Sequence, residues 1–186
     1  IIVTPNALSI CSSTCTSTWS NFTDEYISNV TFNGTPFNST QTSNYTNNTA
    51  SCLNVVQGST YTLSVSWQVT GAFTENVVAF IDWNGDGDFN DAEESQFVGS
   101  SSTAGSHSAN ISISVPCNAV ARNVRMRIIL KYGAPAPTTG CESGTFGETE
   151  DYCLTIVAAT PPVSNAGPDQ NLTCTSSATL NASGST

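Results

Sequence analysis

The stretch "YTLSVSWQV" at residues 61–69 decides the fold class, because apolar and polar side chains alternate along it. Its apolar set is Tyr61, Leu63, Val65, Trp67 and Val69. A period of two residues is typical of a strand with one buried face. "NVRMRIILK" at 123–131 repeats the pattern, and "NISISV" at 110–115 and "DYCLTIV" at 151–157 are shorter examples. Because Gly, Ser, Asn and Pro separate these runs, the sequence predicts an all-β fold, an antiparallel β-sandwich of the jelly-roll or Ig-like type.

Composition limits the partners of this 186-residue chain. Charged residues are only 10% of the total, yet the formal net charge is −10. Such a chain has no basic surface to displace counterions from phosphates, which argues against nucleic acid and anionic membranes as partners. No apolar run approaches the roughly 20 residues that span a bilayer, so no membrane insertion is expected. The chain begins without Met or a signal-peptide pattern, which favours a mature or excised segment over a complete open reading frame.

Changes in composition divide the chain. Residues 159–168, "ATPPVSNAGP", have the Pro-rich composition of a linker that cannot continue a sheet. Residues 169–186 open with strand-like alternation and then stop, which predicts the start of an incomplete second β domain or an exchanged strand. We expect residues 1–19 to form an N-terminal strand or extension and residues 20–158 to form the sandwich.

Seven cysteines are scattered along the chain without a CxxC pair, and His107 is the only histidine. This pattern favours disulfides over a zinc site and predicts an extracellular or cell-surface protein. We expect Cys141 to bond Cys153, because a short excursion returns to the terminal strand there. Cys174, in the truncated tail, is expected to lack a partner within this segment. The disulfide candidates are Cys11, Cys15, Cys52, Cys117, Cys141 and Cys153.

Sequons for N-glycosylation are frequent, and six of them crowd between residues 21 and 47. They begin at Asn21, Asn29, Asn33, Asn38, Asn44, Asn47, Asn110, Asn171 and Asn181. A chain rich in Asn, Ser and Thr produces such triplets by chance, so two interpretations stand: chance, or a glycoprotein with a sugar coat over this segment.

The run "DWNGDGDFNDAEE" at residues 82–94 concentrates acids that repel one another unless water or a cation separates them. Its spacing matches the calcium-loop pattern D-x-[DN]-x-[DN]-G-x5-E. The expected ligands are Asp82, Asn84, Asp86, Asp88 and Glu93, with Asp91 close by. The preceding "VVAFIDW" is strand-like, which excludes the helices of an EF-hand. Calcium is the predicted ion, magnesium is disfavoured by its rigid geometry, and the alternative is a solvated Asp-Gly turn without metal.

Several stretches occur in the order seen in one known family. They are "DEYISNVTF" at 24–32, "GSTYTLSVSW" at 58–67, "VVAFIDWNGDGDFNDAEE" at 77–94, "RNVRMRIIL" at 122–130 and "GETEDYCLTI" at 147–156. The chain from about residue 20 to 158 resembles the GEVED domain, and its last stretch is similar to the name-giving motif with Thr149 in place of Val. The resemblance implies a module of large secreted or surface multidomain proteins, with no catalytic activity of its own. The tail "SNAGPDQNLTCTSSATLNASGS" resembles the start of the PKD-like and Ig-like repeats of bacterial adhesins.

The acids of the GETEDY stretch have two interpretations. In an alternating strand Glu148 and Glu150 share a face and Asp151 points the opposite way. We expect Arg125 and Arg127 to form structural ion pairs across strands with Glu148 or Glu150, or to offset the acidic loop. The alternative is that these carboxylates are further calcium ligands.

No enzyme is predicted, because His107 lies in a Gly/Ser loop without a nucleophile motif around it and each acid cluster has a structural explanation. The expected function is a calcium-stabilised structural or adhesive module of a cell-surface or filamentous assembly. A carbohydrate-binding module that contacts surface glycans is the alternative, with Trp19 as the tryptophan without another expected role. Self-association by strand exchange of residues 1–10 and 169–186 is one hypothesis for these ends, and covalent continuation into neighbouring domains is the other.

Overall fold

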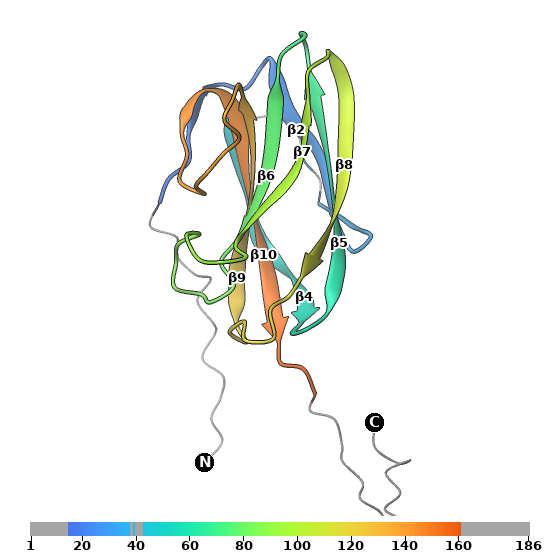
Figure 1. The fold of residues 1–186 in the computed structure, drawn as a ribbon, viewed down its shortest axis with the longest axis vertical. Helices are drawn as coiled ribbons and strands as arrows, with labels where there is room; N and C mark the ends of the chain where they lie inside the picture. Colours follow the sequence, from blue (N-terminus) through green and yellow to red (C-terminus); the bar gives the residue numbers. More distant parts are fainter. Residues whose placement is uncertain (1–14, 38, 40–42, 161–186) are drawn as a thin grey trace, which may run out of the picture.

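A computed structural model describes residues 15–37, 39 and 43–160 of the chain (Figure 1). The expectations for the N-terminal strand, the linker, the second domain and strand exchange fall mainly outside these residues. The same holds for Cys11, Cys174, Asn38, Asn171 and Asn181. Among the residues described, no helix is long and apolar enough to cross a membrane.

The described residues form ten strands and no helix, arranged in two sheets. The strands are β1 (Trp19–Asn21), β2 (Glu25–Phe32), β3 (Thr35–Phe37), β4 (Tyr45–Val56), β5 (Thr60–Val69), β6 (Glu75–Ile81), β7 (Ser95–Ser101), β8 (Gly105–Ser114), β9 (Asn123–Tyr132) and β10 (Gly144–Val157). One sheet has the order β1-β10-β9-β6-β7 with β4 also paired to β10, and the other has the order β3-β2-β5-β8. The two sheets lie face to face in Figure 1. The predicted all-β sandwich is thereby confirmed.

Most strand pairs are antiparallel as predicted, but β10 is an exception. It pairs in parallel with β1, where Trp19 lies opposite Gly144, and with β4, where Cys52 lies opposite Cys153. On its other edge β10 pairs antiparallel with β9. The sheet is therefore mixed, because segments far apart in sequence meet along one edge of its longest strand.

The core lies between the sheets and follows the predicted alternation. In β5 the inward residues Leu63, Val65, Trp67 and Val69 are all buried. β9 is buried on both faces, because a second, smaller cluster covers the outer face of the larger sheet. Its buried members are Trp19, Val78, Phe80, Phe89 and Ile129. Phe89 comes from the acidic loop, so this outer cluster attaches the loop to the sheet.

Two disulfides join Cys15 to Cys141 and Cys52 to Cys153. The expected Cys141–Cys153 bond is therefore wrong. Cys153 lies opposite Cys52 in the parallel β4–β10 pair, and the partner of Cys141 comes from the segment before β1. Cys117 is a free, exposed cysteine. Residues 15–19, expected in an extension, are thus attached to the sandwich.

Candidate metal centre

The acidic loop, residues 82–94, follows directly after β6. Every residue of β6 is buried, so the strand has one defined end from which the loop emerges. Gly85 and Gly87 adopt positive φ angles of 72° and 99°, which allow the chain to fold back on itself. The loop conformation is therefore defined by the strand before it and by two glycines within it.

Asp82, the first residue of the loop, is buried and organises the backbone around it. Its Oδ1 accepts hydrogen bonds from the backbone N–H of Gly85 at 2.7 Å and of Asp86 at 3.1 Å. Its Oδ2 accepts one from the N–H of Gly87 at 3.1 Å. These three bonds occupy the carboxylate with backbone donors, so Asp82 shapes the loop from inside.

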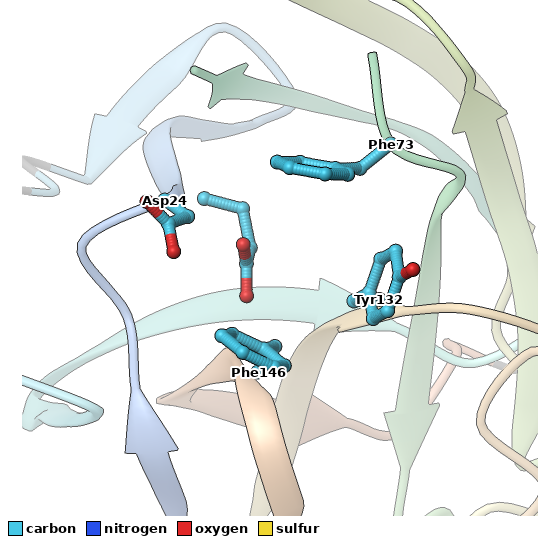
Figure 2. Close-up of a pocket in the computed structure, with 5 residues that line it drawn as sticks. Asp24, Phe73, Tyr132 and Phe146 are labelled. Carbon is cyan, nitrogen blue, oxygen red and sulfur yellow. The ribbon is translucent and has the colours of Figure 1, made fainter. Parts of the chain in front are cut away.

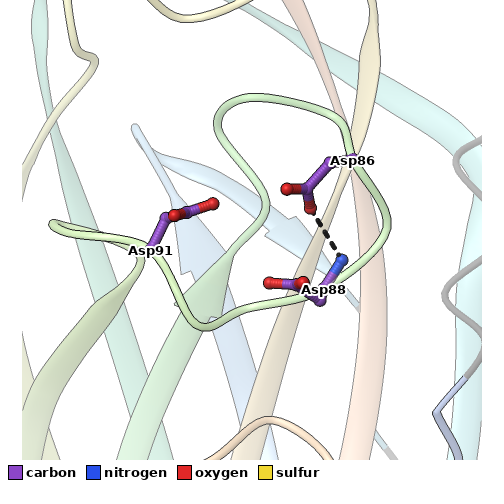
Figure 3. Close-up of side chains that lie close together, drawn as sticks. All are labelled: Asp86, Asp88 and Asp91. Atoms are coloured by element: carbon purple, nitrogen blue, oxygen red, sulfur yellow. Dashed lines mark hydrogen bonds between the residues drawn. The ribbon is translucent and has the colours of Figure 1, made fainter.

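Three exposed carboxylates converge at the outside of the loop. Asp86, Asp88 and Asp91 each offer one oxygen, and these oxygens lie within 4.8 Å of one another (Figure 3). Short backbone turns hold two of them, because Asp86 Oδ1 accepts the N–H of Asp88 at 3.0 Å and Asp88 Oδ1 accepts that of Asn90 at 2.9 Å. An acidic Asp cluster of this kind can bind a metal ion.

The side chain of Asn84 lies among these carboxylates. Its Nδ2 donates to Asp86 Oδ2 at 3.0 Å and to Asp91 Oδ2 at 2.6 Å. Its Oδ1 accepts the backbone N–H of Asp86 at 2.9 Å. Of the predicted ligands, the structure therefore brings Asn84, Asp86, Asp88 and Asp91 together.

Glu93, the expected final ligand, does not join this group among the described residues. Its φ is +70°, and its backbone carbonyl accepts the Trp83 indole N–H at 3.3 Å. The next residue, Glu94, turns inward instead and accepts the N–H of Trp83 at 2.9 Å and of Asp91 at 3.2 Å. Burial raises the pKa of Glu94 to about 7. Sequence reasoning missed Glu94, because the calcium-loop pattern places its last acid one residue earlier.

The expected ion pairs between Arg125 or Arg127 and the two glutamates are wrong. Arg127 lies opposite Asp151 in the β9–β10 pair, whereas Glu150 lies opposite Ile128. Residues that lie opposite each other in a sheet point to the same face. Arg127 consequently forms a fork with Asp151, with Nε at 2.6 Å from Oδ1 and Nη2 at 2.8 Å from Oδ2. Arg125 Nη1 adds a contact to Asp151 Oδ2 at 3.1 Å.

Glu148 and Glu150 point into the sandwich and are fully buried. Glu148 Oε2 accepts the backbone N–H of Ile27 at 2.6 Å, and Glu150 accepts hydrogen bonds from the hydroxyls of Ser39 and Tyr152. Burial raises the pKa of Glu148 to about 8 and also raises that of Glu150. Neither joins the Asp86 cluster. These two acids link the sheets rather than the loop.

The tryptophans and sequons also have defined positions. Trp19, expected to lack another role, is buried and donates its indole N–H to Thr149 Oγ1 at 2.8 Å. Trp67 and Trp83 are buried as expected. Of the sequon asparagines, Asn33, Asn47 and Asn110 are exposed, whereas Asn21, Asn29 and Asn44 are partly buried. The described tryptophans therefore offer no stacking platform for sugars at the surface.

Comparisons with known proteins show which residues of this chain resemble a known family. The comparison with curated proteins gives no match. One solved structure with a partly similar path is titled "The details of glycolipid glycan hydrolysis by the structural analysis of a family 123 glycoside hydrolase from Clostridium perfringens". Its sequence identity is 13% and its TM-score 0.37, over 63% of this chain and 23% of that one, so the likeness carries no argument. A family model described as the GEVED domain matches residues 76–155. The part from β6 to β10, which holds both the acidic loop and the GETEDY stretch, is thus the part that matches the GEVED domain.

Proposed function

We propose that this chain is a non-catalytic, extracellular structural module whose acidic loop binds calcium. The bound ion would stiffen the loop against the sandwich, and the module would serve as a building block of a cell-surface or filamentous assembly. The observation that carries the calcium proposal is the convergence of three carboxylates, two of which share the Asn84 amide group.

The donor set supports calcium in particular. Asp86, Asp88 and Asp91 supply only oxygen, which suits a hard cation. Their like charges repel, and the Asn84 N–H groups between Asp86 and Asp91 offset this only in part. Rotating the amide by 180° exchanges its nitrogen and oxygen, so the same side chain can provide an oxygen ligand. Calcium tolerates such an irregular set, whereas magnesium requires rigid octahedral geometry. Calcium ligation by Asp82 and Glu93 stays a prediction.

A structural role is supported by what the other acids do. Glu148 and Glu150 lie inside the sandwich with hydrogen-bond partners from β2 and its neighbourhood, and Asp151 holds two arginines. The His107 ring lies 5.8 Å from the Trp67 ring, and its Nε2 lies 2.7 Å from the carbonyl oxygen of Thr103. Two disulfides are typical of proteins in oxidising compartments.

Calcium titration tests the proposal. Modules of extracellular type bind with Kd of roughly 10⁻⁴ to 10⁻³ M. At a calcium concentration about ten times Kd, mass action stabilises the fold by about 1.4 kcal/mol. We expect the melting temperature to rise by roughly 3–6 °C relative to EDTA. Asp88→Asn should abolish the rise, and Asp24→Asn, outside the loop, should preserve it. A folded chain that holds no metal and melts identically in EDTA contradicts the proposal.

Assembly is tested separately, on the full chain with calcium present. Electron micrographs and sedimentation should show polymers, and deletion of residues 1–10 or 169–186 should abolish them if strand exchange forms the contacts. A chain that stays monomeric at high concentration contradicts the exchange hypothesis and leaves the ends as connections to other domains.

A further inference from the structure

A second acidic site lies at the opposite end of β6 from the calcium loop. It is a cavity of about 150 Å³ lined by Asp24, Glu25, Phe73, Tyr132 and Phe146. Glu25 opens β2 in one sheet, whereas Tyr132 closes β9 and Phe146 belongs to β10 in the other. The cavity therefore lies at the end of the sandwich, between the two sheets.

Three aromatic rings form its walls. Tyr132 meets both phenylalanines edge to face, with ring centroids 5.6 Å from Phe73 and 5.8 Å from Phe146. In Figure 2 the rings of Phe73 and Phe146 lie on opposite sides of the space, with Tyr132 on a third. Phe73 and Tyr132 are 39% and 44% exposed, so the cavity is accessible from solvent.

Two buried carboxylates accompany these rings. Glu25 is 1% exposed, and its Oε1 has no hydrogen-bond partner among the described residues. Glu75 is fully buried, and neither of its oxygens has a partner there. Glu75 lies opposite Tyr132 in the β6–β9 pair, so both side chains leave the same face of the sheet. Burial, with Asp24 nearby, raises the pKa of Glu25 to about 7, and burial with Glu25 nearby raises that of Glu75 to about 8.

The lysines and arginines of the chain do not neutralise these acids. The chain has four in all, and each contacts another group. Arg125 and Arg127 bind Asp151, Lys131 binds Glu142, and Arg122 Nη1 donates to the Gly85 carbonyl at 3.0 Å. Buried charge without a partner is costly, so Glu25 and Glu75 either stay protonated or meet a cation from outside the chain.

We propose that this cavity, with Phe73, Tyr132 and Phe146 as its walls, Glu25 in its lining and Glu75 close behind Glu25, binds an organic ammonium group. Aromatic faces attract alkylammonium ions through their quadrupole, and buried carboxylates supply the opposite charge. A metal ion would gain little from a lining that is mainly aromatic. At about 150 Å³ the cavity is smaller than the roughly 300–1,000 Å³ of most small-molecule sites, so it suits one head group.

Calorimetric titration of the full chain with n-butylammonium and with tetramethylammonium tests this at about pH 9, above the raised pKa values of both glutamates. We expect saturable binding of at least one probe. Preference for the primary amine indicates a lysine-like source, and preference for the quaternary ion indicates a trimethylammonium compound. Absence of binding by both probes to the folded chain overturns the proposal.

Variants separate this site from the calcium loop. Glu25→Gln keeps the shape of the side chain and should weaken binding about 10-fold or more, as expected for a charge-assisted contact. Phe73→Leu, at an exposed loop position, should fold normally and weaken binding roughly 2- to 30-fold. Asp88→Asn should leave binding unchanged. The proposal is contradicted if Glu25→Gln and Phe73→Leu both bind the amine as tightly as the unchanged chain does. Displacement of the amine by calcium also contradicts it.

Discussion

Arg127 connects three parts of the molecule through one buried guanidinium. It forms the fork with Asp151, donates Nη1 to the Gly140 carbonyl at 2.6 Å, and lies 5.5 Å from the centroid of the Phe89 ring. Gly140 precedes Cys141 of the first disulfide, and Phe89 belongs to the acidic loop. A single side chain thus holds β10, the disulfide segment and the loop in one arrangement.

Arg127→Met should be strongly destabilising, because it leaves the buried Asp151 carboxylate with a weakened set of partners. Loss of one member of a buried ion pair costs about 3–5 kcal/mol. Denaturant unfolding measures this loss. The control is Lys131→Met, which breaks the more exposed pair with Glu142 and should cost less than about 1 kcal/mol. Equal losses of unfolding free energy in the two variants would show that the buried ion pair of Arg127 contributes no more to stability than the more exposed pair of Lys131.

Gly147, the first residue of the GETEDY stretch, has a steric reason to be glycine. Its φ is +153°, and a Cβ there would lie 2.5 Å from the Leu130 carbonyl oxygen and 2.7 Å from the Trp19 ring. Gly147→Ala should therefore lower the free energy of unfolding by about 2 kcal/mol or more. Gly105→Ala is the matched control, because Gly105 also has positive φ but no atom near its Cβ position. Similar losses of stability in Gly147→Ala and Gly105→Ala would mean that the positive φ, and not the contact with Leu130 and Trp19, causes the loss.

At the scale of elements, the alternation of apolar and polar residues predicted where strands occur, but it did not predict which strands pair with each other. β5 and β9 were predicted because their apolar residues recur every second position, which burial enforces directly. The parallel pairing of β4 with β10 has no local signal, since its residues are about 100 positions apart. The Cys52–Cys153 bond depends on that pairing, and the partner of Arg127 depends on the β9–β10 register, so both were assigned wrongly.

The attachment of the acidic loop can be tested through Phe89. This ring is buried against Phe80 at a centroid distance of 6.0 Å, so it anchors a loop whose outer carboxylates, those of Asp86, Asp88 and Asp91, are exposed. Phe89→Leu should cost less than about 1.5 kcal/mol of stability but weaken calcium binding several-fold, because the ion must then order the loop. The control is Phe97→Leu on β7, where the ring is 57% exposed. Unchanged calcium affinity in Phe89→Leu contradicts the anchoring role.

Across the whole molecule, charge is distributed unevenly. Positive charge lies on β9 and just before it, whereas buried acids occur in both sheets. The Asp cluster of the acidic loop was predictable because the spacing of its residues matches a known ligand motif. Glu25 and Glu75 were missed because a single acid at a strand end resembles any surface acid until the fold buries it, and Glu94 was missed because the motif ends at Glu93. Only the three-dimensional structure shows that these carboxyls are buried.

The buried acids predict how stability depends on pH. The pKa of Glu25, Glu75 and Glu148 is raised by burial to between about 7 and 8 in the folded state. The folded state then holds more protons than the unfolded state, so their contribution is fully present below about pH 4.5 and is lost as pH rises through about 7 to 8. At about 1.4 kcal/mol per pKa unit, each carboxyl should contribute at most about 3–5 kcal/mol to this loss.

Melting curves of the metal-free chain between about pH 5 and 9 measure this dependence. Glu75→Gln should flatten the curve, because an amide does not titrate, and Glu142→Gln at the partly exposed pair should not. If the melting temperatures of Glu75→Gln and of the unchanged chain depend on pH in the same way across this range, the protonation of Glu75 is not coupled to folding.

The Cys15–Cys141 disulfide has a mechanical consequence. It joins residues 126 positions apart, and β10 begins three residues after Cys141. Tension that enters the chain before Cys15 and leaves after β10 passes through the sulfur bridge directly into that last strand. The sandwich between the two cysteines lies off the line of force, as a closed loop that cannot lengthen under load. Stretching can release only the short stretch from Cys141 onward, so a pulled module would behave as a nearly inextensible link, and reduction of the bridge would make it a long, extensible one.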